Sequence, residues 1–111
     1  VDTLVRHGEA AVPTLADARR LASDVETRAA AVFALHRIGS PAARAAVRDA
    51  LADRELDVRV AAARSVGLAP DAAALPTLLR AVVNDQPAVR RQAATAIEQI
   101  GDPVAVPALL K

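Results

Sequence analysis

Apolar residues recur with helical spacing in three segments that lie 31 residues apart. Counted from Arg28, Arg59 and Arg90, the offsets −1, +3, +4, +6, +7 and +10 fall within one arc of a helix. In the third segment this arc holds Val89, Ala93, Ala94, Ala96, Ile97 and Ile100. The offsets +1, +2, +5, +8 and +9 fall on the opposite side. The pattern predicts three amphipathic helices in repeated positions.

A second set of helices is expected between these three. Residues 41–53 and 71–84 each carry apolar residues at helical spacing, with short polar turns at 53–55 and 84–87. Asp71 suits an N-cap, and Pro76 means that its helix either starts late or bends. Gly39 and Gly101 suit the left-handed position that follows a helix. Sustained two-residue alternation is absent, so we expect no strands.

These helices form repeats of two. We expect the end of one repeat at residues 1–8, full repeats at 9–39, 40–70 and 71–101, and the first half of another at 102–111. The expected fold is all-α: an α-α superhelix, or solenoid, of antiparallel helix pairs with about 3.5 repeats. We interpret the chain as a piece cut from a longer array, or as an array with degenerate terminal units. Apolar area on the terminal helices then predicts some self-association.

Composition narrows the function classes. The chain has no Cys and two His, which excludes disulfides, thiol chemistry and a His-rich zinc site. Phe33 is its one aromatic residue, and its net charge is +1, so nucleic-acid binding is not indicated. With neither a membrane-spanning run nor a signal-peptide pattern, the expected location is cytoplasmic, without membrane contact. Of 111 residues, 29 are alanine, which suits closely packed helices.

The segment Asp57-Val58-Arg59-x-x-Ala62-Ala63-x-x-Val66, with its 31-residue period, resembles HEAT-like repeats, and most closely the short type named after phycobilisome lyases. Residues 88–103 match that pattern well. The other units depart from it at Thr27, Gly67 and Pro70. The resemblance implies an armadillo-like superhelix that acts as an interaction scaffold. It also leaves open an activity as a bilin lyase or lyase subunit, and a related helical-repeat group acts on DNA.

The repeated arginines allow two interpretations. Arg28, Arg59 and Arg90 open the second helix of each repeat, where they could pair with acids of the turns between paired helices. Stacked repeats would align such pairs into a structural ladder. Alternatively, the guanidinium groups bind an anionic ligand. The acids considered as partners are Asp24, Glu26, Glu55, Asp57 and Asp85.

The outward side of the second helices is the expected binding surface, since this side lines the concave surface in related solenoids. Phe33 lies almost opposite the apolar arc, so it either anchors a partner or packs against a neighbouring repeat. The residues expected to bind a partner are Phe33, His36, Arg37, Arg64, Leu68, Arg91, Thr95 and Glu98.

No residue set indicates catalysis. Neither His7 nor His36 has a paired nucleophile or carboxylate, and phosphate-loop and nucleophile-elbow motifs are absent. Residues 53–57 hold three acids but lack the glycine turn of a calcium loop. We therefore predict a non-catalytic module of a larger protein that binds a protein partner and needs no metal or cofactor. Bilin lyase activity and weak nucleic-acid binding are the alternatives.

Overall fold

The computed structural model describes the backbone of residues 2–101 and the side chains of residues 8–101. Over this range the chain forms helices and no strand, so the all-α prediction is confirmed. The helices are α1 (Asp2–Leu21), α2 (Val25–Ile38), α3 (Pro41–Ala50), α4 (Leu56–Leu68), a short 3₁₀ helix (Ala72–Ala74), α5 (Leu75–Asn84) and α6 (Pro87–Ile100).

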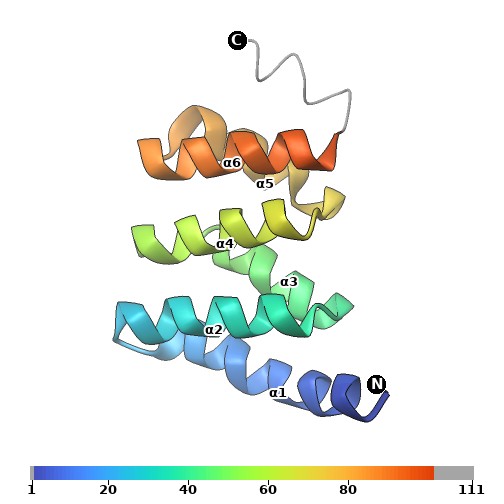
Figure 1. Ribbon diagram of the computed structural model, residues 1–111. Coiled ribbons are helices and arrows are strands. Elements are labelled where there is room, and N and C mark those ends of the chain that lie inside the picture. Colours follow the sequence, from blue (N-terminus) through green and yellow to red (C-terminus); the bar gives the residue numbers. More distant parts are fainter. Residues whose placement is uncertain (1, 102–111) are drawn as a thin grey trace.

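The helices form two layers (Figure 1). The second helices of the pairs, α2, α4 and α6, lie side by side in one layer. α3 and α5 lie behind them, and α1 runs beneath α2 and also contacts α3. The Cα atoms extend over 44 × 32 × 15 Å, which is a slab two helices thick. This is the predicted superhelix of stacked antiparallel pairs. It has two edges: a turn edge, where paired helices connect (residues 22–24, 51–55 and 85–86), and a loop edge, where one pair leads to the next (residues 39–40 and 69–71).

Local sequence signals explain the helix ends. The Asp24 carboxylate accepts hydrogen bonds from the backbone N–H groups of Glu26 and Thr27, which caps α2. Gly39 and Gly101 have φ of 65° and 70°, the left-handed conformation predicted for them. Asp71 caps the 3₁₀ helix rather than α5, and Pro76 is at the start of α5. Of the two outcomes expected for Pro76, the late start is the one that occurs.

One predicted boundary differs from the structure. The repeat alignment ends a second helix at Gly8, but α1 is a single helix of 20 residues that passes through Gly8 and Pro13. Gly8 does not adopt a positive φ, so it does not terminate the helix. A Cβ atom there would lie 3.4 Å from the Ile38 side chain, so glycine allows a close contact. The half repeat expected at 102–111 lies outside the described residues.

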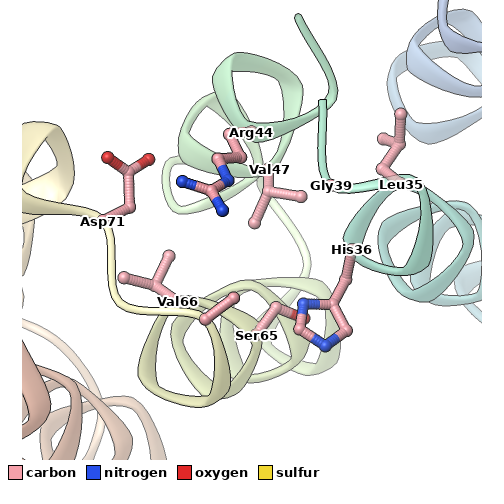
Figure 2. A pocket seen from close by; sticks show the side chains of 9 residues that line it. Leu35, His36, Gly39, Arg44, Val47, Ser65, Val66 and Asp71 are labelled. Carbon is pink, nitrogen blue, oxygen red and sulfur yellow. The ribbon is translucent and has the colours of Figure 1, made fainter. Parts of the chain in front are cut away.

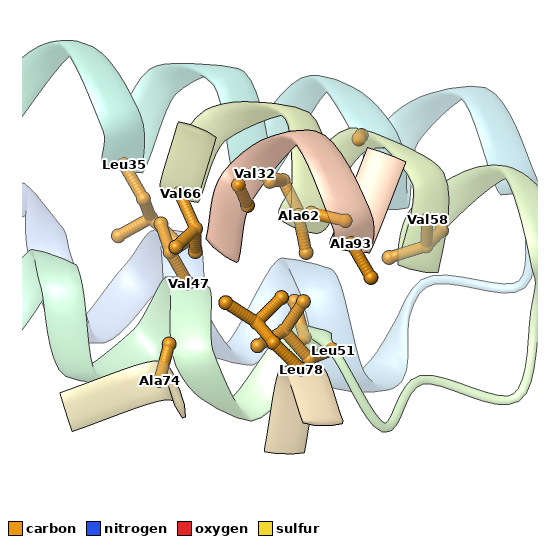
Figure 3. Close-up of a cluster of buried hydrophobic side chains, with 14 of the residues drawn as sticks. Val32, Leu35, Val47, Leu51, Val58, Ala62, Val66, Ala74, Leu78 and Ala93 are labelled. Atoms are coloured by element: carbon orange, nitrogen blue, oxygen red, sulfur yellow. The ribbon is translucent and has the colours of Figure 1, made fainter. Parts of the chain in front are cut away.

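The core lies between the two layers and runs through all repeats (Figure 3). Leu35 and Val66 of the second helices meet Val47 of α3, and Leu78 of α5 packs in the same cluster. Small residues hold α4 and α6 close together: a Cβ on Gly67 would lie 3.4 Å from the Ala96 Cα atom. Alanine and glycine at this contact let the two helix axes approach closely.

Candidate functional site

The first arginine of the repeat, Arg28, is buried at the turn edge. Its Nη1 donates to the carbonyl oxygens of Arg20 (2.7 Å) and Ala22 (3.1 Å), which belong to the end of its own helix pair. Its Nη2 donates to Asp53 Oδ2 at 2.6 Å, and Asp53 belongs to the next repeat. Arg19 of α1 also donates to Asp53 and to Asp49. Asp53 therefore joins α1, α2 and the turn between α3 and α4.

Arg59 repeats this arrangement one unit later. Its Nη1 donates to the carbonyl oxygen of Asp53 at 2.9 Å and to that of Arg54 at 3.2 Å. Its Nη2 and Nε donate to Asp85 of the following turn, at 3.0 and 3.1 Å. Each arginine thus links the turn of its own pair to an aspartate of the next turn. The two links share Asp53, so they form one continuous polar chain, which we call the arginine ladder.

The charge of Asp53 is set by its surroundings. Burial by itself raises the pKa of this carboxyl, whose residue is 3% exposed. The backbone N–H of Glu55 and the guanidinium groups of Arg28 and Arg19 outweigh burial and hold the pKa below its ordinary value. Asp53 therefore stays ionised near neutral pH and compensates two buried cations. The Nε atoms of Arg19 and Arg28 are buried without a hydrogen-bond partner among the described residues. Arg19 also pairs with Asp49, whereas Arg28 pairs with Asp53 alone in this part of the chain, so Arg28 depends the more strongly on Asp53.

The ladder differs in its partners from the one expected. Asp85 was among the acids considered, but Asp53 and Arg19 were not. Asp57 is exposed in the first turn of α4, and no contact with its carboxylate is found among the described residues. Arg90 is exposed, also without such a contact to the side chains of residues 8–101. The donors of Arg28 and Arg59 are directed at protein oxygens, which is the arrangement of a structural ion pair rather than of a ligand site.

The outward side of α2, α4 and α6 is largely exposed to solvent. We call it the second-helix face. Phe33 is 44% exposed and Leu68 is 67% exposed, although both are large apolar residues. Ala61, placed on this side by the helical pattern, is buried instead. The expected partner-binding residues that lie exposed here are Phe33, Arg37, Arg64, Leu68, Arg91, Thr95 and Glu98, and His36 is partly buried beside them.

A groove runs along this face between α4 and α6. It has a volume of about 380 Å³ and is lined by Arg64, Gly67, Leu68, Gln92, Thr95 and Gln99. Gly67 is among the lining residues, at a point where a Cβ would lie 3.4 Å from the Ala96 Cα atom of α6. Three predicted binding residues, Arg64, Leu68 and Thr95, are therefore brought together by the fold. The groove combines one apolar side chain, one guanidinium and several neutral hydrogen-bonding groups.

At the loop edge, α2, α3 and α4 enclose a pocket of about 20 Å³ (Figure 2). His36, Arg44 and Asp71 line it together with Ser65, whose hydroxyl is buried without a hydrogen-bond partner. Asp71 accepts a hydrogen bond from Arg48 at 2.6 Å. The pocket has room for about one water molecule, far less than an organic ligand requires. Ser65 and Arg44 were not singled out from the sequence, because only helix stacking brings them together.

Other kinds of site find no support in the described residues. No group of three or more His, Cys, Asp and Glu side chains is placed to hold a metal ion there. Among the helices of residues 2–101, none has the length and apolar character required to cross a bilayer. His7, considered as an acid–base residue, lies outside the described side chains.

Comparison with protein families agrees with the architecture. The model for HEAT repeats matches residues 50–111, and the model for the PBS lyase HEAT-like repeat matches residues 27–53. A comparison with curated proteins finds no similar one. The first match covers more than half of the chain, and it agrees with the stacked helix pairs and the 31-residue period. The chain therefore belongs to the HEAT repeat family.

Proposed function

We propose that this chain is a non-catalytic scaffold that binds a protein partner on the second-helix face. HEAT repeats are generally protein-interaction scaffolds. The observation that carries the location is the exposure of Phe33 and Leu68 beside the exposed arginines Arg37 and Arg64 on one side of a helix layer. Large apolar residues surrounded by polar groups are typical of the centre of an interface.

The distribution of polar contacts supports this face over the turn edge. Arg28 and Arg59 already donate to carbonyl and carboxylate oxygens, so a partner would have to compete with internal bonds. Within the described residues, the side chains of Arg37 and Arg64 have no such contacts. Their guanidinium groups are available for bidentate bonds to a partner.

Site-specific photo-crosslinking in cells tests the proposal. A photoreactive phenylalanine analogue would replace Phe33 or Leu68 in the full protein. Leu21 and Val83 serve as matched control positions, because they are also apolar and exposed but lie on α1 and α5. We expect a discrete crosslinked protein from positions 33 and 68 and none from the controls. Crosslinks from positions 21 or 83 alone would place the partner on the other layer and refute the proposal.

Bilin lyase activity is the second candidate, because the PBS lyase repeat model matches residues 27–53. It predicts that adding the protein changes the absorbance spectrum of a bilin. An unchanged spectrum at saturating protein would contradict it.

A further inference from the structure

Four exposed residues on α2 and α4 form a square in which apolar and positively charged side chains alternate. Phe33 and Arg37 are one helical turn apart on α2, and Arg64 and Leu68 are one turn apart on α4. The 31-residue register places Phe33 across from Arg64, and Arg37 across from Leu68. The apolar residues occupy one diagonal of this square and the arginines occupy the other. We call these four residues the diagonal patch.

The dimensions of the patch suit an extended peptide. Residues i and i+4 on a helix lie about 5–6 Å apart, and adjacent helix axes lie about 8–10 Å apart. An extended chain advances roughly 3 Å per residue, so about three residues span the step from α2 to α4. The groove between α4 and α6 continues from the patch, and Gln92, Thr95 and Gln99 line it. These neutral polar groups suit hydrogen bonds to a peptide backbone.

The charge of this region is positive. Arg37 and Arg64 lie on the patch, and Arg44 is exposed at the adjoining loop edge. The acid of the same loop edge, Asp71, is already bound by Arg48. The exposed acids of α2 and α4 on this face, Glu26 and Asp57, lie in the first turns, at the opposite ends of these helices. A cation near a helix C-terminus stabilises the helix dipole, which accounts for Arg37 but not for the exposed Leu68.

We propose that the diagonal patch binds an acidic peptide segment in which apolar residues separate the acidic ones. The peptide carboxylates pair with Arg37 and Arg64, and its apolar side chains cover Phe33 and Leu68. This inference rests on the proposed scaffold function and specifies the chemistry of the partner. A nucleic acid fits less well, because Phe33 is the one aromatic residue available for stacking.

Fluorescence anisotropy with defined peptides tests this assignment. The probe is a fluorescein-labelled peptide of four Ser-Asp-Leu repeats, measured against the full chain in about 0.15 M salt. Two matched probes replace every Asp by Lys or every Leu by Ser, and a third is a 12-nucleotide single-stranded DNA. We expect the Ser-Asp-Leu peptide to bind roughly tenfold more tightly than each of the others. Equal or tighter binding of the Lys peptide, or of the DNA, would overturn the proposal.

Variants then locate the binding site. Arg37→Glu and Arg64→Glu should each weaken binding of the Ser-Asp-Leu peptide roughly tenfold, and Leu68→Ser should weaken it several-fold. Arg54→Glu and Arg80→Glu are matched controls, because both arginines are exposed but lie at the turn edge and on α5. They should change the affinity less than about twofold. Circular dichroism verifies that every variant is folded.

The failure of this inference can be separated from failure of the scaffold function. Unchanged binding in the Arg37 and Arg64 variants would reject the acidic peptide. If positions 33 and 68 still crosslink to a cellular protein, the second-helix face remains the interface for a partner of different chemistry. If those positions do not crosslink either, the scaffold proposal itself is wrong at this face.

Discussion

At the turn edge, Arg28 and Arg59 lie among carbonyl and carboxylate oxygens, whereas Arg37 and Arg64 are exposed at or near the loop edge. The residue type is the same, but the acceptors differ. At the turn edge, free carbonyl oxygens lie at the end of α1 and in the turn after α3, and the next turn adds an aspartate. At the loop edge, Asp71 is the nearby acid, and Arg48 already binds it.

This difference separates residues that hold repeats together from residues available to a partner. Arg28 and Asp53 join consecutive repeats, so their loss should be measured as lost stability. Arg37 and Arg64 join nothing within the described residues, so their loss should be measured as lost binding. Each edge can therefore be tested with a readout that the other edge leaves unchanged.

The largest effect is expected from Asp53→Asn. The substitution removes the negative charge that Arg19 and Arg28 share. Arg19 keeps its pair with Asp49, whereas Arg28 stays buried without a carboxylate partner among the described residues. Breaking such a buried arrangement costs about 3–5 kcal/mol of unfolding free energy. Urea denaturation followed by circular dichroism measures the loss. Asp57→Asn is the matched control, four residues away and exposed, and it should cost less than about 1 kcal/mol. Equal losses of unfolding free energy in the two variants would contradict a structural role for Asp53.

In the unmodified chain, low pH should weaken the ion pairs of Asp53 with Arg19 and Arg28. The pKa of Asp53 is lower in the folded protein than its ordinary value, so the unfolded state binds a proton more readily. The stabilisation is therefore complete above the unfolded pKa, about 3.9, and is lost as the pH falls through the folded pKa. Denaturation series between neutral pH and about pH 3 should show a smaller pH-dependent loss in Asp53→Asn than in the unmodified chain. Parallel pH profiles for the two proteins would contradict this assignment.

A smaller effect is expected one repeat later. Arg59 and Asp85 form a forked pair that is partly open to solvent, with side-chain exposures of 19% and 16%. A double-mutant cycle with Arg59→Ala and Asp85→Ala should give a coupling energy of about 1–2 kcal/mol, below the effect of Asp53→Asn. A coupling near zero would mean that the carbonyl contacts of Arg59, rather than Asp85, hold the second link.

The exposed residues of the second-helix face could be predicted from the sequence, but the ion-pair partners at the turn edge could not. The exposure of Phe33, Arg64 and Leu68 follows from helical periodicity, because it depends only on which side of one helix faces the core. The partner of Arg28 depends on how the turns of successive repeats stack. The 31-residue period does not show which residue of the next turn comes to lie beside Arg28. Asp53 lies two residues before its N-cap and Asp85 only one, so the two ladder acids do not align in the sequence.

The positions of the remaining acids explain why the expected partners were partly wrong. Asp24 lies at an N-cap, where its carboxylate accepts backbone N–H groups of α2 instead of pairing with an arginine. Asp57 lies within the first turn of α4 and faces solvent. A turn acid reaches the preceding repeat only from positions before the cap. The fold was predictable because its signal repeats along the chain, while the ladder contacts are set by tertiary stacking.

The smallest change in unfolding free energy is expected at Arg64, although its replacement should clearly weaken peptide binding. Arg64→Gln keeps a long polar side chain on α4 and removes a charge that has no contact within the described residues, so it should change the unfolding free energy by less than about 0.5 kcal/mol. Arg28→Gln makes the identical change at the turn edge, where it leaves Asp53 with one cation fewer and the carbonyl oxygens of Arg20 and Ala22 without their donor. It should cost several-fold more. Denaturation of both variants under the same conditions measures the contrast, and similar losses would mean that Arg64 also has a structural role.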